Sequence, residues 1–399
     1  MATRDGLGLE VSLLTGGWDR PYVFGLTTAL AKDGIAVDLI AGDDLSAADF
    51  PEATALTLLR FKERHRPGAG VATKALRVMS YYCRLVKYAW TARPRIFHIV
   101  WNNGYDTFDR VLLMLYYRML GKRVVLTAHN VNAGRRDAKD TPLNRLTLKF
   151  QYALSDHIFV HTEKMKQELV DGFGIGSESV TVIPFGINNS VPDTDLTPAQ
   201  ARARLGIGAN EKTLLFFGNI APYKGLEYLV NAFLQVASQN HGYRLIVAGR
   251  PKPGSVDGYW ERIESIIGRE PESRGITLRI EYIPDADTEI YFKAADVLVL
   301  PYTDIFQSGV LFLGYSFGLP ALVADVGSLK DEVHEGENGF VFAPRDAADL
   351  ARTIERYFAS DLFGALAERR CAIREHAART HSWDTVAEMT RNVYLSSQA

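Results

Sequence analysis

Short apolar runs alternate with helical patterns along this chain, and this alternation constrains its fold more than any other feature of the sequence. Amphipathic stretches, most of them ten residues or longer, separate the runs. Parallel strands need a long crossover connection, which a helix usually supplies, so the alternation predicts βαβ units and a parallel sheet. In the first half of the chain we expect strands at residues 9–15, 35–40, 55–61, 96–100, 124–128, 157–160 and 180–184.

A polar break interrupts the alternation near the middle of the chain. Residues 191–211 contain Pro, Asp and Gly and read as a linker with one short helix. The predicted fold class is α/β, with two Rossmann-like, doubly wound parallel-sheet domains that face a cleft, at residues 1–190 and 212–381. Residues 382–399 form a final helix in this interpretation. In the second domain we expect strands at residues 214–217, 245–248, 277–282, 297–300 and 321–324.

Composition excludes several classes of protein. Hydrophobic residues make up 47% and charged residues 23%, as in ordinary globular proteins, and a net charge of −2 gives no overall field that would attract nucleic acid. Two cysteines, Cys83 and Cys371, cannot build a disulfide framework or a thiolate metal cluster. No stretch approaches the roughly 18–20 apolar residues of a membrane span, and the first residues lack an apolar signal core. We therefore expect a cytoplasmic protein, which can still lie on the cytoplasmic face of a membrane.

The segment FFGNIAPYKG, residues 216–225, ends an expected buried strand and leads into a helix. Gly218 lets a ligand approach the backbone, with Asn219 next to it. Lys224 places a positive charge at a helix start, where the helix dipole already favours an anion. The segment has the chemistry to bind a diphosphate, although a solvated lysine at a helix start is the simpler alternative.

A second segment, residues 297–326, runs from an apolar strand through a polar loop into another helix. Ser308 suits the N-cap position of that helix. The backbone N–H groups around Ser308, Gly309 and Val310 could hold phosphate oxygens without a charged side chain. An ordinary capped helix is the alternative here.

Together these residues resemble the retaining glycosyltransferases of family 4, which have the GT-B fold. Gly218, Lys224 and Gly225 match the family's G-R-x-x-x-x-K-G loop. A second family motif, A-x-x-x-G-x-P-V-V-A-T-D-V-G-G, is matched by Gly318, Pro320, Ala324, Asp325, Val326 and Gly327. The resemblance covers nearly the whole chain. It implies that residues 1–190 bind the acceptor, that residues 212–381 bind the nucleotide sugar, and that the helix of residues 382–399 packs back on the first domain. It also implies an enzyme of the hexosyltransferase type that moves a sugar from a nucleotide-diphosphate donor to a lipid-linked glycan, polysaccharide or related acceptor, with retention of configuration.

The chain departs from the family at three positions. Asn219 stands where the family usually has an arginine on the donor diphosphate, and Ile305 and Leu313 occupy the two glutamate positions of its E-x(7)-E motif. In the family the first glutamate touches the transferred sugar and the second holds the ribose. Two alternatives therefore stay open: a non-catalytic GT-B subunit that binds glycan or a partner enzyme, and a nucleotide-sugar epimerase.

Further candidate residues follow other strands. His129 and Asn130 come directly after residues 124–128, and a histidine there can hydrogen-bond a sugar hydroxyl. The family resemblance assigns His129 and Lys224 to catalysis. It also assigns groups near the sugar or the acceptor, Gly16, Gly17, Asn130 and Gln307, and groups near the nucleotide, Gly249, Arg250, Tyr282 and Ile283.

Residues 60–95 hold ten Lys or Arg and one acid, on an otherwise neutral chain. Lys74, Arg77, Tyr81, Arg84 and Tyr88 recur at helical spacing, which predicts a basic, aromatic helix face. Such a face can lie against anionic headgroups or a polyprenyl phosphate. A solvated helix face is the alternative.

We expect no metal and no cofactor, with the nucleotide sugar as a substrate. Asp285 and Asp287 have the letters of a D-x-D metal motif, but their place at a helix start makes capping the better interpretation.

Overall fold

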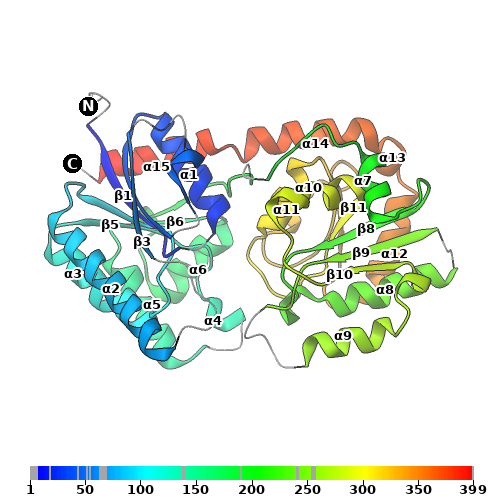
Figure 1. Ribbon diagram of the computed structural model, residues 1–399, viewed down its shortest axis with the longest axis horizontal. Coiled ribbons are helices and arrows are strands. Elements are labelled where there is room, and N and C mark those ends of the chain that lie inside the picture. Colours follow the sequence, from blue (N-terminus) through cyan, green and yellow to red (C-terminus); the bar gives the residue numbers. More distant parts are fainter. Residues whose placement is uncertain are drawn as a thin grey trace. The chain divides into compact units, whose positions relative to one another are not determined.

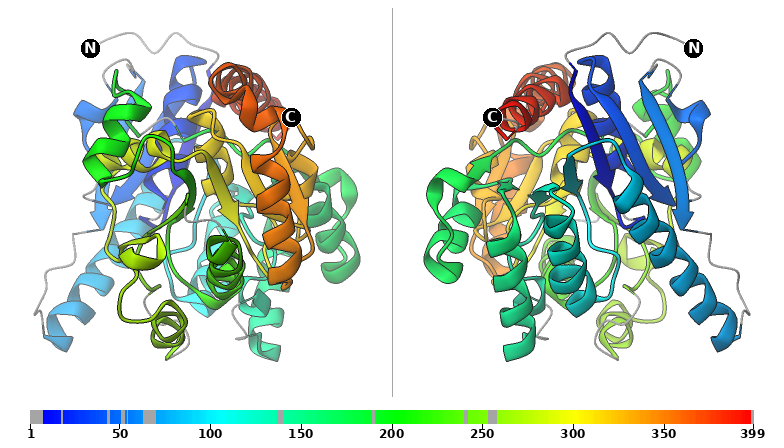
Figure 2. Two further views of the ribbon diagram at one scale, coloured as in Figure 1. Left: turned by 90° about the vertical axis from the view of Figure 1, so that its right-hand side faces the viewer. Right: turned by 90° about the vertical axis from the view of Figure 1, so that its left-hand side faces the viewer.

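The computed structural model describes residues 8–17, 19–42, 45–50, 53, 55–62, 70–136, 140–188, 191–239, 242–252 and 258–397. The chain divides into two compact units, one formed by residues 1–186 with 382–399 and the other by residues 187–381. Each unit is built on a parallel sheet with helices on both faces (Figures 1 and 2). An α/β fold with two parallel sheets is therefore confirmed.

Within its described residues, the sheet of unit 1 has seven strands in the order β3-β2-β1-β4-β5-β6-β7. After β1 the chain adds β2 and β3 on one side of this strand, and then adds β4 and the later strands on its other side. The boundary between β1 and β4 is therefore the topological switch point, where sheets of this kind bind ligands. The elements are β1 (Glu10–Leu14), α1 (Arg20–Lys32), β2 (Ala36–Gly42), η1 (Ala47–Asp49), β3 (Leu56–Lys62), α2 (Val71–Thr91), β4 (Ile96–Ile99), η2 (Phe108–Leu113), α3 (Met114–Met119), β5 (Arg123–Thr127), α4 (Ala133–Arg136), α5 (Pro142–Leu154), β6 (His157–Val160), α6 (Glu163–Phe173), η3 (Ser177–Ser179), β7 (Val180–Val182) and α15 (Trp383–Ser396).

The sheet of unit 2 repeats this plan, with the order β10-β9-β8-β11-β12-β13 and a switch point between β8 and β11. Helices α8, α9 and α12 cover one face, and α10 and α11 cover the other (Figure 1). The elements are α7 (Pro198–Leu205), β8 (Lys212–Phe217), η4 (Pro222–Lys224), α8 (Leu226–Gln239), β9 (Tyr243–Ala248), α9 (Tyr259–Ile267), η5 (Glu272–Arg274), β10 (Ile276–Arg279), α10 (Asp285–Ala294), β11 (Val297–Leu300), α11 (Gly309–Ser316), β12 (Ala321–Ala324), η6 (Lys330–Glu332), β13 (Gly339–Phe342), α12 (Ala347–Phe358), α13 (Asp361–Gly364) and α14 (Leu366–Thr380).

Residues 191–211, which precede β8, belong to unit 2. Its helix α7 packs on α10, and the Thr194 backbone N–H donates to Glu289 Oε2 at 2.9 Å. Lys293 Nζ lies 2.8 Å from an oxygen of Asp193, in the same stretch. These polar contacts hold residues 193–205 against the second sheet's helices.

The last helix, α15, belongs to unit 1, where it lies beside α1 (Figure 1). Trp383 at its start packs on the backbone of Gly25 and Gly186, where no side chain occupies the space. Farther along, Tyr394 Oη lies 2.5 Å from Nδ1 of the buried His98 in β4, whose Nε2 lies 2.7 Å from Thr127 Oγ1. The chain end is thus fixed to the sheet by an aromatic side chain and a buried polar network.

The Gly25 contact can be tested by substitution. A Cβ at Gly25 would lie 2.0 Å from Trp383 Cε2, so Gly25→Ala should displace α15 and lower the free energy of unfolding by about 1–3 kcal/mol. Gly172→Ala in α6 is the matched control, because a Cβ there meets only Glu168 Cγ at 3.9 Å, and it should raise stability by roughly 0.5–1 kcal/mol. Urea denaturation measures both; an equal change in both variants would contradict the packing of Trp383 on α1.

Burial makes His98 a source of acid sensitivity. Desolvation, with a smaller effect from His157, lowers the pKa of His98 to about 3, whereas an unfolded histidine titrates near 6.5. Between pH 6.5 and 3 the unfolded chain therefore binds a proton that the native chain does not, and stability falls as pH falls. His98→Gln should lower the number of protons taken up on unfolding by nearly one between pH 6 and 4, and so should reduce the slope of the unfolding free energy against pH. An unchanged slope in urea titrations at these pH values would show that the native histidine is charged.

Candidate functional site

In unit 2, the loops that follow the two strands at the switch point carry the candidate diphosphate residues. Gly218 and Lys224 follow β8, and Ser308, Gly309 and Val310 follow β11. The carboxyl ends of parallel strands meet at one edge of the sheet, so residues 90 positions apart in sequence come together there.

Two glycines allow the backbones after β8 and β9 to touch. A Cβ at Gly249 would lie 1.8 Å from the carbonyl oxygen of Gly218, and both residues have positive φ, 148° and 101°. The contact continues through Ile220, whose N–H donates to the Arg250 carbonyl at 2.8 Å. Asn219 lies exposed on the turn between them. The glycines thus fix the shape of the loop that leads to Lys224.

The Lys224 ammonium, the Gly218 turn and the first turn of α11 converge. Lys224 is only 6% exposed, and its Nζ lies 5.2 Å from the centre of the Tyr302 ring. A Cβ at Gly218 would lie 3.1 Å from Lys224 Nζ and 3.6 Å from Val310 Cγ2. A positive charge is thus held next to the N-terminus of a helix, where the dipole adds to it.

Ser308 occupies the N-cap position of α11, as we expected, but its side chain makes no capping hydrogen bond. The Ser308 hydroxyl lies 3.2 Å from Tyr302 Oη, and among the described residues it accepts from no N–H of α11. The buried tyrosine hydroxyl competes for it. The N–H groups of a first helical turn have no partner within the helix, so they can bind an anion.

The loop before α11 is anchored at both ends. Thr303 N–H donates to the Tyr223 carbonyl, and Ser328 N–H donates to the Phe306 carbonyl, each at 2.8 Å. A Cβ at Gly327 would lie 1.8 Å from the Ile305 carbonyl oxygen, so this family-motif glycine lets the two loops touch.

A carboxylate that we did not single out from the sequence reaches this loop. Glu332 Oε1 lies 3.3 Å from Gln307 Nε2, and Glu332 Oε2 lies 3.3 Å from His381 Nε2. Gln307 Oε1 is buried without a hydrogen-bond partner among the described residues. Leu313, at the family's second glutamate position, is buried. Glu332 lies 22 positions after Val310, the nearest predicted site residue in the sequence, so no local spacing indicates it.

The structure brings two of the expected nucleotide residues together. The Arg250 guanidinium carbon lies 5.2 Å from the centre of the exposed Tyr282 ring, which presents a cationic and aromatic surface beyond β9 and β10. Strand β10 ends at Arg279, so Tyr282 lies in the loop after the strand rather than at its end as we expected. Its neighbour Ile283 is buried.

In unit 1, the Gly16–Gly17 turn follows β1 and packs on the loop after β4. A Cβ at Gly16 would lie 2.4 Å from the Asn102 carbonyl oxygen, which explains the glycine. Lys62 Nζ donates to the Gly16 carbonyl at 2.6 Å and brings an ammonium group to the turn. No feature of the sequence distinguishes Lys62 from the other basic residues near it.

His129 stands in an aromatic cluster at the end of β5. The Trp101 ring stacks on it with centroids 4.3 Å apart and an angle of 9°, and Tyr22 meets it edge-on at 4.5 Å. His161 Nε2 lies 3.1 Å from His129 Nδ1. Burial, and then the proximity of His161 and His98, hold the pKa of His129 well below its usual value, against a smaller opposing effect of the Val100 carbonyl. The ring is therefore neutral at pH 7.

Several buried polar atoms near this cluster lack partners within the described part of the chain: His129 Nε2, Asn130 Oδ1 and Trp101 Nε1. Buried polar groups are normally hydrogen-bonded, so these three unpartnered atoms make the cluster a candidate site for a polar ligand. Trp101 was not among the residues we selected, because a lone aromatic residue after a strand carries no functional signal in sequence.

The basic helix face that we expected on α2 is partly wrong. Tyr81 is buried and its hydroxyl donates to Asn103, while the Tyr88 hydroxyl donates to Asp38 at 2.7 Å. Both tyrosines therefore point into unit 1, with Leu85 and Ala89. Lys74 and Arg84 are exposed and Arg77 is partly exposed, so the outward face of α2 is basic without these two rings.

The described residues contain no group of three or more His, Cys, Asp or Glu side chains arranged to hold a metal ion. Asp285 begins α10, whose N-cap residue is Pro284, so the expected capping by these acids is replaced by two acids in the first turn, Asp285 and Asp287. None of the helices in the described ranges is both long and apolar enough to cross a bilayer.

Two family models match the chain. Residues 20–191 match "Glycosyltransferase Family 4", and residues 211–360 match "Glycosyl transferases group 1". Two curated relatives are D-inositol 3-phosphate glycosyltransferases. That of Streptomyces bingchenggensis is 30% identical over 248 residues, 61% of this chain and 53% of the relative, and that of Corynebacterium glutamicum is 23% identical over 389 residues, 94% and 90%. The chain thus spans only about half the length of the Streptomyces relative. It spans a similar share, 54%, of the D-inositol 3-phosphate glycosyltransferase of Acidothermus cellulolyticus.

Solved structures share the fold. A sucrose-phosphate synthase from Thermosynechococcus elongatus superposes with a TM-score of 0.75 at 20% identity, covering 97% of this chain and 98% of that one. HepE of Anabaena in complex with UDP-glucose gives 0.73 at 16% identity, covering 97% and 99%. The chain thus carries a family 4 glycosyltransferase domain over residues 20–191 and a group 1 glycosyltransferase domain over residues 211–360, on the GT-B fold that these structures share.

Proposed function

We propose that the chain transfers a sugar from a nucleotide-diphosphate donor to a lipid-linked glycan, polysaccharide or related acceptor, with retention of configuration and without a metal ion. The observation that carries the proposal is the buried ammonium of Lys224 beside the Gly218 turn and the N-terminus of α11. Few ligands other than a phosphate group suit a lysine, a glycine turn and uncapped helix N–H groups at one point.

The reaction needs stabilisation of the charge that develops on the departing diphosphate. In our proposal the Lys224 ammonium and the N–H groups of Gly309 and Val310 supply it. These donors are fixed by the packing of the loops around them, so they need no reorganisation as the glycosidic bond breaks. Preorganised donors of this kind also remove the need for a divalent cation.

We assign sugar recognition to the cluster around His129. Its neutral ring presents Nε2 to a hydroxyl of the transferred sugar, and Asn130 and Trp101 add polar atoms beside it. In unit 1 we assign the Gly16–Gly17 turn to the acceptor. In unit 2 we assign Gln307 to polar contact with the donor, because its buried Oε1 has no partner among the described residues. The nucleotide lies at Gly249, Arg250 and the loop after β10, with Glu332 as a carboxylate available in place of the missing family glutamates.

Titration calorimetry with UDP, GDP and ADP tests the diphosphate site. Lys224→Met should weaken the best-bound nucleotide about 10- to 100-fold, because it removes charge-assisted hydrogen bonds of about 1.5–3 kcal/mol in total. Lys212→Met is the control, because Lys212 begins β8 and lies at the opposite end of that strand from Gly218. The Lys212→Met variant should bind the nucleotide as tightly as the wild type. Equal affinity in wild type and Lys224→Met would refute the phosphate assignment.

Nucleotide release from a panel of nucleotide sugars tests the transfer and the role of His129. His129→Ala should reduce turnover about tenfold, the effect of one lost hydrogen bond in a dry site, and leave nucleotide binding unchanged. His157→Ala, a histidine at the opposite end of the neighbouring strand, should turn over normally. Nucleotide binding without turnover of any donor would favour the non-catalytic subunit, and donor isomerisation without an acceptor would favour the epimerase.

A further inference from the structure

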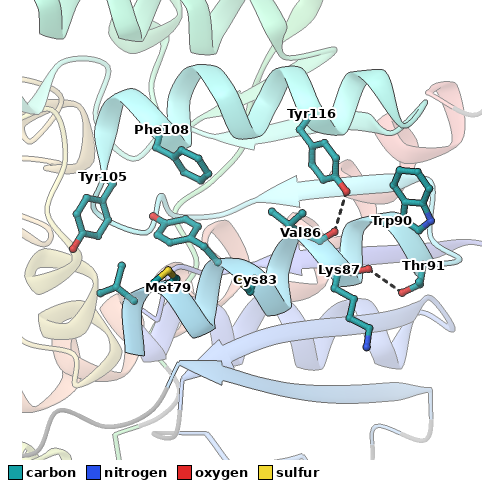
Figure 3. Close-up of a pocket in the computed structure, with 11 residues that line it drawn as sticks. Met79, Cys83, Val86, Lys87, Trp90, Thr91, Tyr105, Phe108 and Tyr116 are labelled. Atoms are coloured by element: carbon teal, nitrogen blue, oxygen red, sulfur yellow. Dashed lines mark hydrogen bonds between the residues drawn. The ribbon is translucent and has the colours of Figure 1, made fainter. Parts of the chain in front are cut away.

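Unit 1 has an apolar groove outside the candidate site. It encloses about 900 Å³ between α2 and the helical segment η2–α3 (Figure 3). Met79, Cys83 and Trp90 line it from α2, and Tyr105, Phe108 and Tyr116 face them from the other side (Figure 3). Tyr116 Oη donates to the Val86 carbonyl at 3.1 Å and joins the two walls.

The surface around this groove is apolar to an unusual degree. Thirteen large hydrophobic side chains are exposed among the described residues, and eleven of them lie on α2, η2–α3, α5 or the loop before η2. Met79 and Trp90 are 57% and 72% exposed at the groove itself. Exposed apolar side chains concentrated on one part of a protein mark a surface that binds something apolar.

The same helices carry a strong positive charge. The sequences of α2, η2–α3 and α5 contain eight Lys or Arg and a single acid, Asp109, which is buried. The whole chain has a net charge of −2, so this charge is local. A partner that fits must therefore be both apolar and anionic. A second copy of this face would set like charges against each other, which disfavours self-association through it.

One loop connects the groove to the His129 cluster. Trp101 stacks on His129, and four positions later Tyr105 lines the groove. Asp109 holds this loop rigidly, since it accepts from the backbone N–H groups of Asn103, Gly104 and Tyr105 at 3.1, 3.0 and 2.9 Å. From Val78 to Thr91 the groove follows α2 for about 20 Å, away from the carboxyl ends of the strands. A chain-like molecule lying in it would place one end beside the candidate sugar site.

We propose that this groove binds the hydrocarbon chain of a lipid acceptor whose anionic head lies at the Tyr105 end, near His129. The proposal rests on the proposed function, because it gives the acceptor of that reaction a binding site. Apolar walls hold the chain, the basic residues of α2 attract the phosphate-bearing head, and the fixed loop sets the distance from the head to the sugar.

The two cysteines offer a direct test. Both Cys83 and Cys371 are exposed, and Cys83 lies in the groove while Cys371 lies on α14 of unit 2. Dodecyl phosphate below its micelle concentration should slow maleimide labelling of Cys83 at least fivefold and leave Cys371 unaffected, as followed by peptide mass spectrometry. A neutral dodecyl ether should give the same protection of Cys83 only at a concentration at least tenfold higher. Unprotected Cys83 at saturating dodecyl phosphate would overturn the proposal, and equal potency of the two amphiphiles would overturn the anionic head.

Two matched variants separate the groove from a general surface effect. Met79→Glu puts a charge inside the groove and should abolish protection. Leu76 is a similarly exposed apolar residue of α2 outside the lining, so Leu76→Glu should retain protection. Protection that appears only with phosphatidylglycerol vesicles and is the same in both variants would mean contact with a bilayer surface, against the groove. Calorimetry with UDP on Met79→Glu distinguishes this proposal from the proposed function. If the variant loses protection of Cys83 but still binds UDP, the substitution has affected the groove and not the nucleotide site.

Discussion

The close approach of backbone at the carboxyl ends of β8, β9 and β11 is the constraint on which the candidate site depends. Gly249 lets its strand end touch the Gly218 carbonyl, and Gly327 lets the loop after β12 touch Ile305. The Lys224 ammonium lies against the Gly218 turn, beside the start of α11. The phosphate chemistry that we assign to the site thus follows from glycines that bind nothing themselves.

Much of the architecture could be predicted from hydrophobic periodicity, because both sheets are parallel and their central strands are continuous apolar runs. Strand β13 was missed because its apolar run, Gly339–Phe342, has only four residues and directly follows a turn. Helix α14 was also missed, because its fifteen residues are mostly polar and bury only Ile373 and Ala377 on one side. A helix with so few apolar residues has no clear hydrophobic periodicity, and hydrophobic periodicity is the pattern from which helices are predicted.

The candidate site, like the fold, has residues that could be predicted from the sequence and residues that could not. Residues that follow strands, such as Lys224 and His129, could be selected because the carboxyl end of a parallel strand is a defined place. Glu332, Lys62 and Trp101 could not, because their importance comes from contacts across the sheet edge. The tyrosines of α2 show the opposite error: helical spacing placed Tyr81 and Tyr88 on the basic face, whereas their hydroxyls bond inward to Asn103 and Asp38.

The most direct test is a crystal structure of the protein grown with UDP, GDP or ADP, whichever binds best. The account predicts electron density for the terminal phosphate within hydrogen-bonding distance of Lys224 Nζ and of the N–H groups of Gly309 and Val310. Density for that phosphate at any other part of unit 2, with Lys224 untouched, would contradict it.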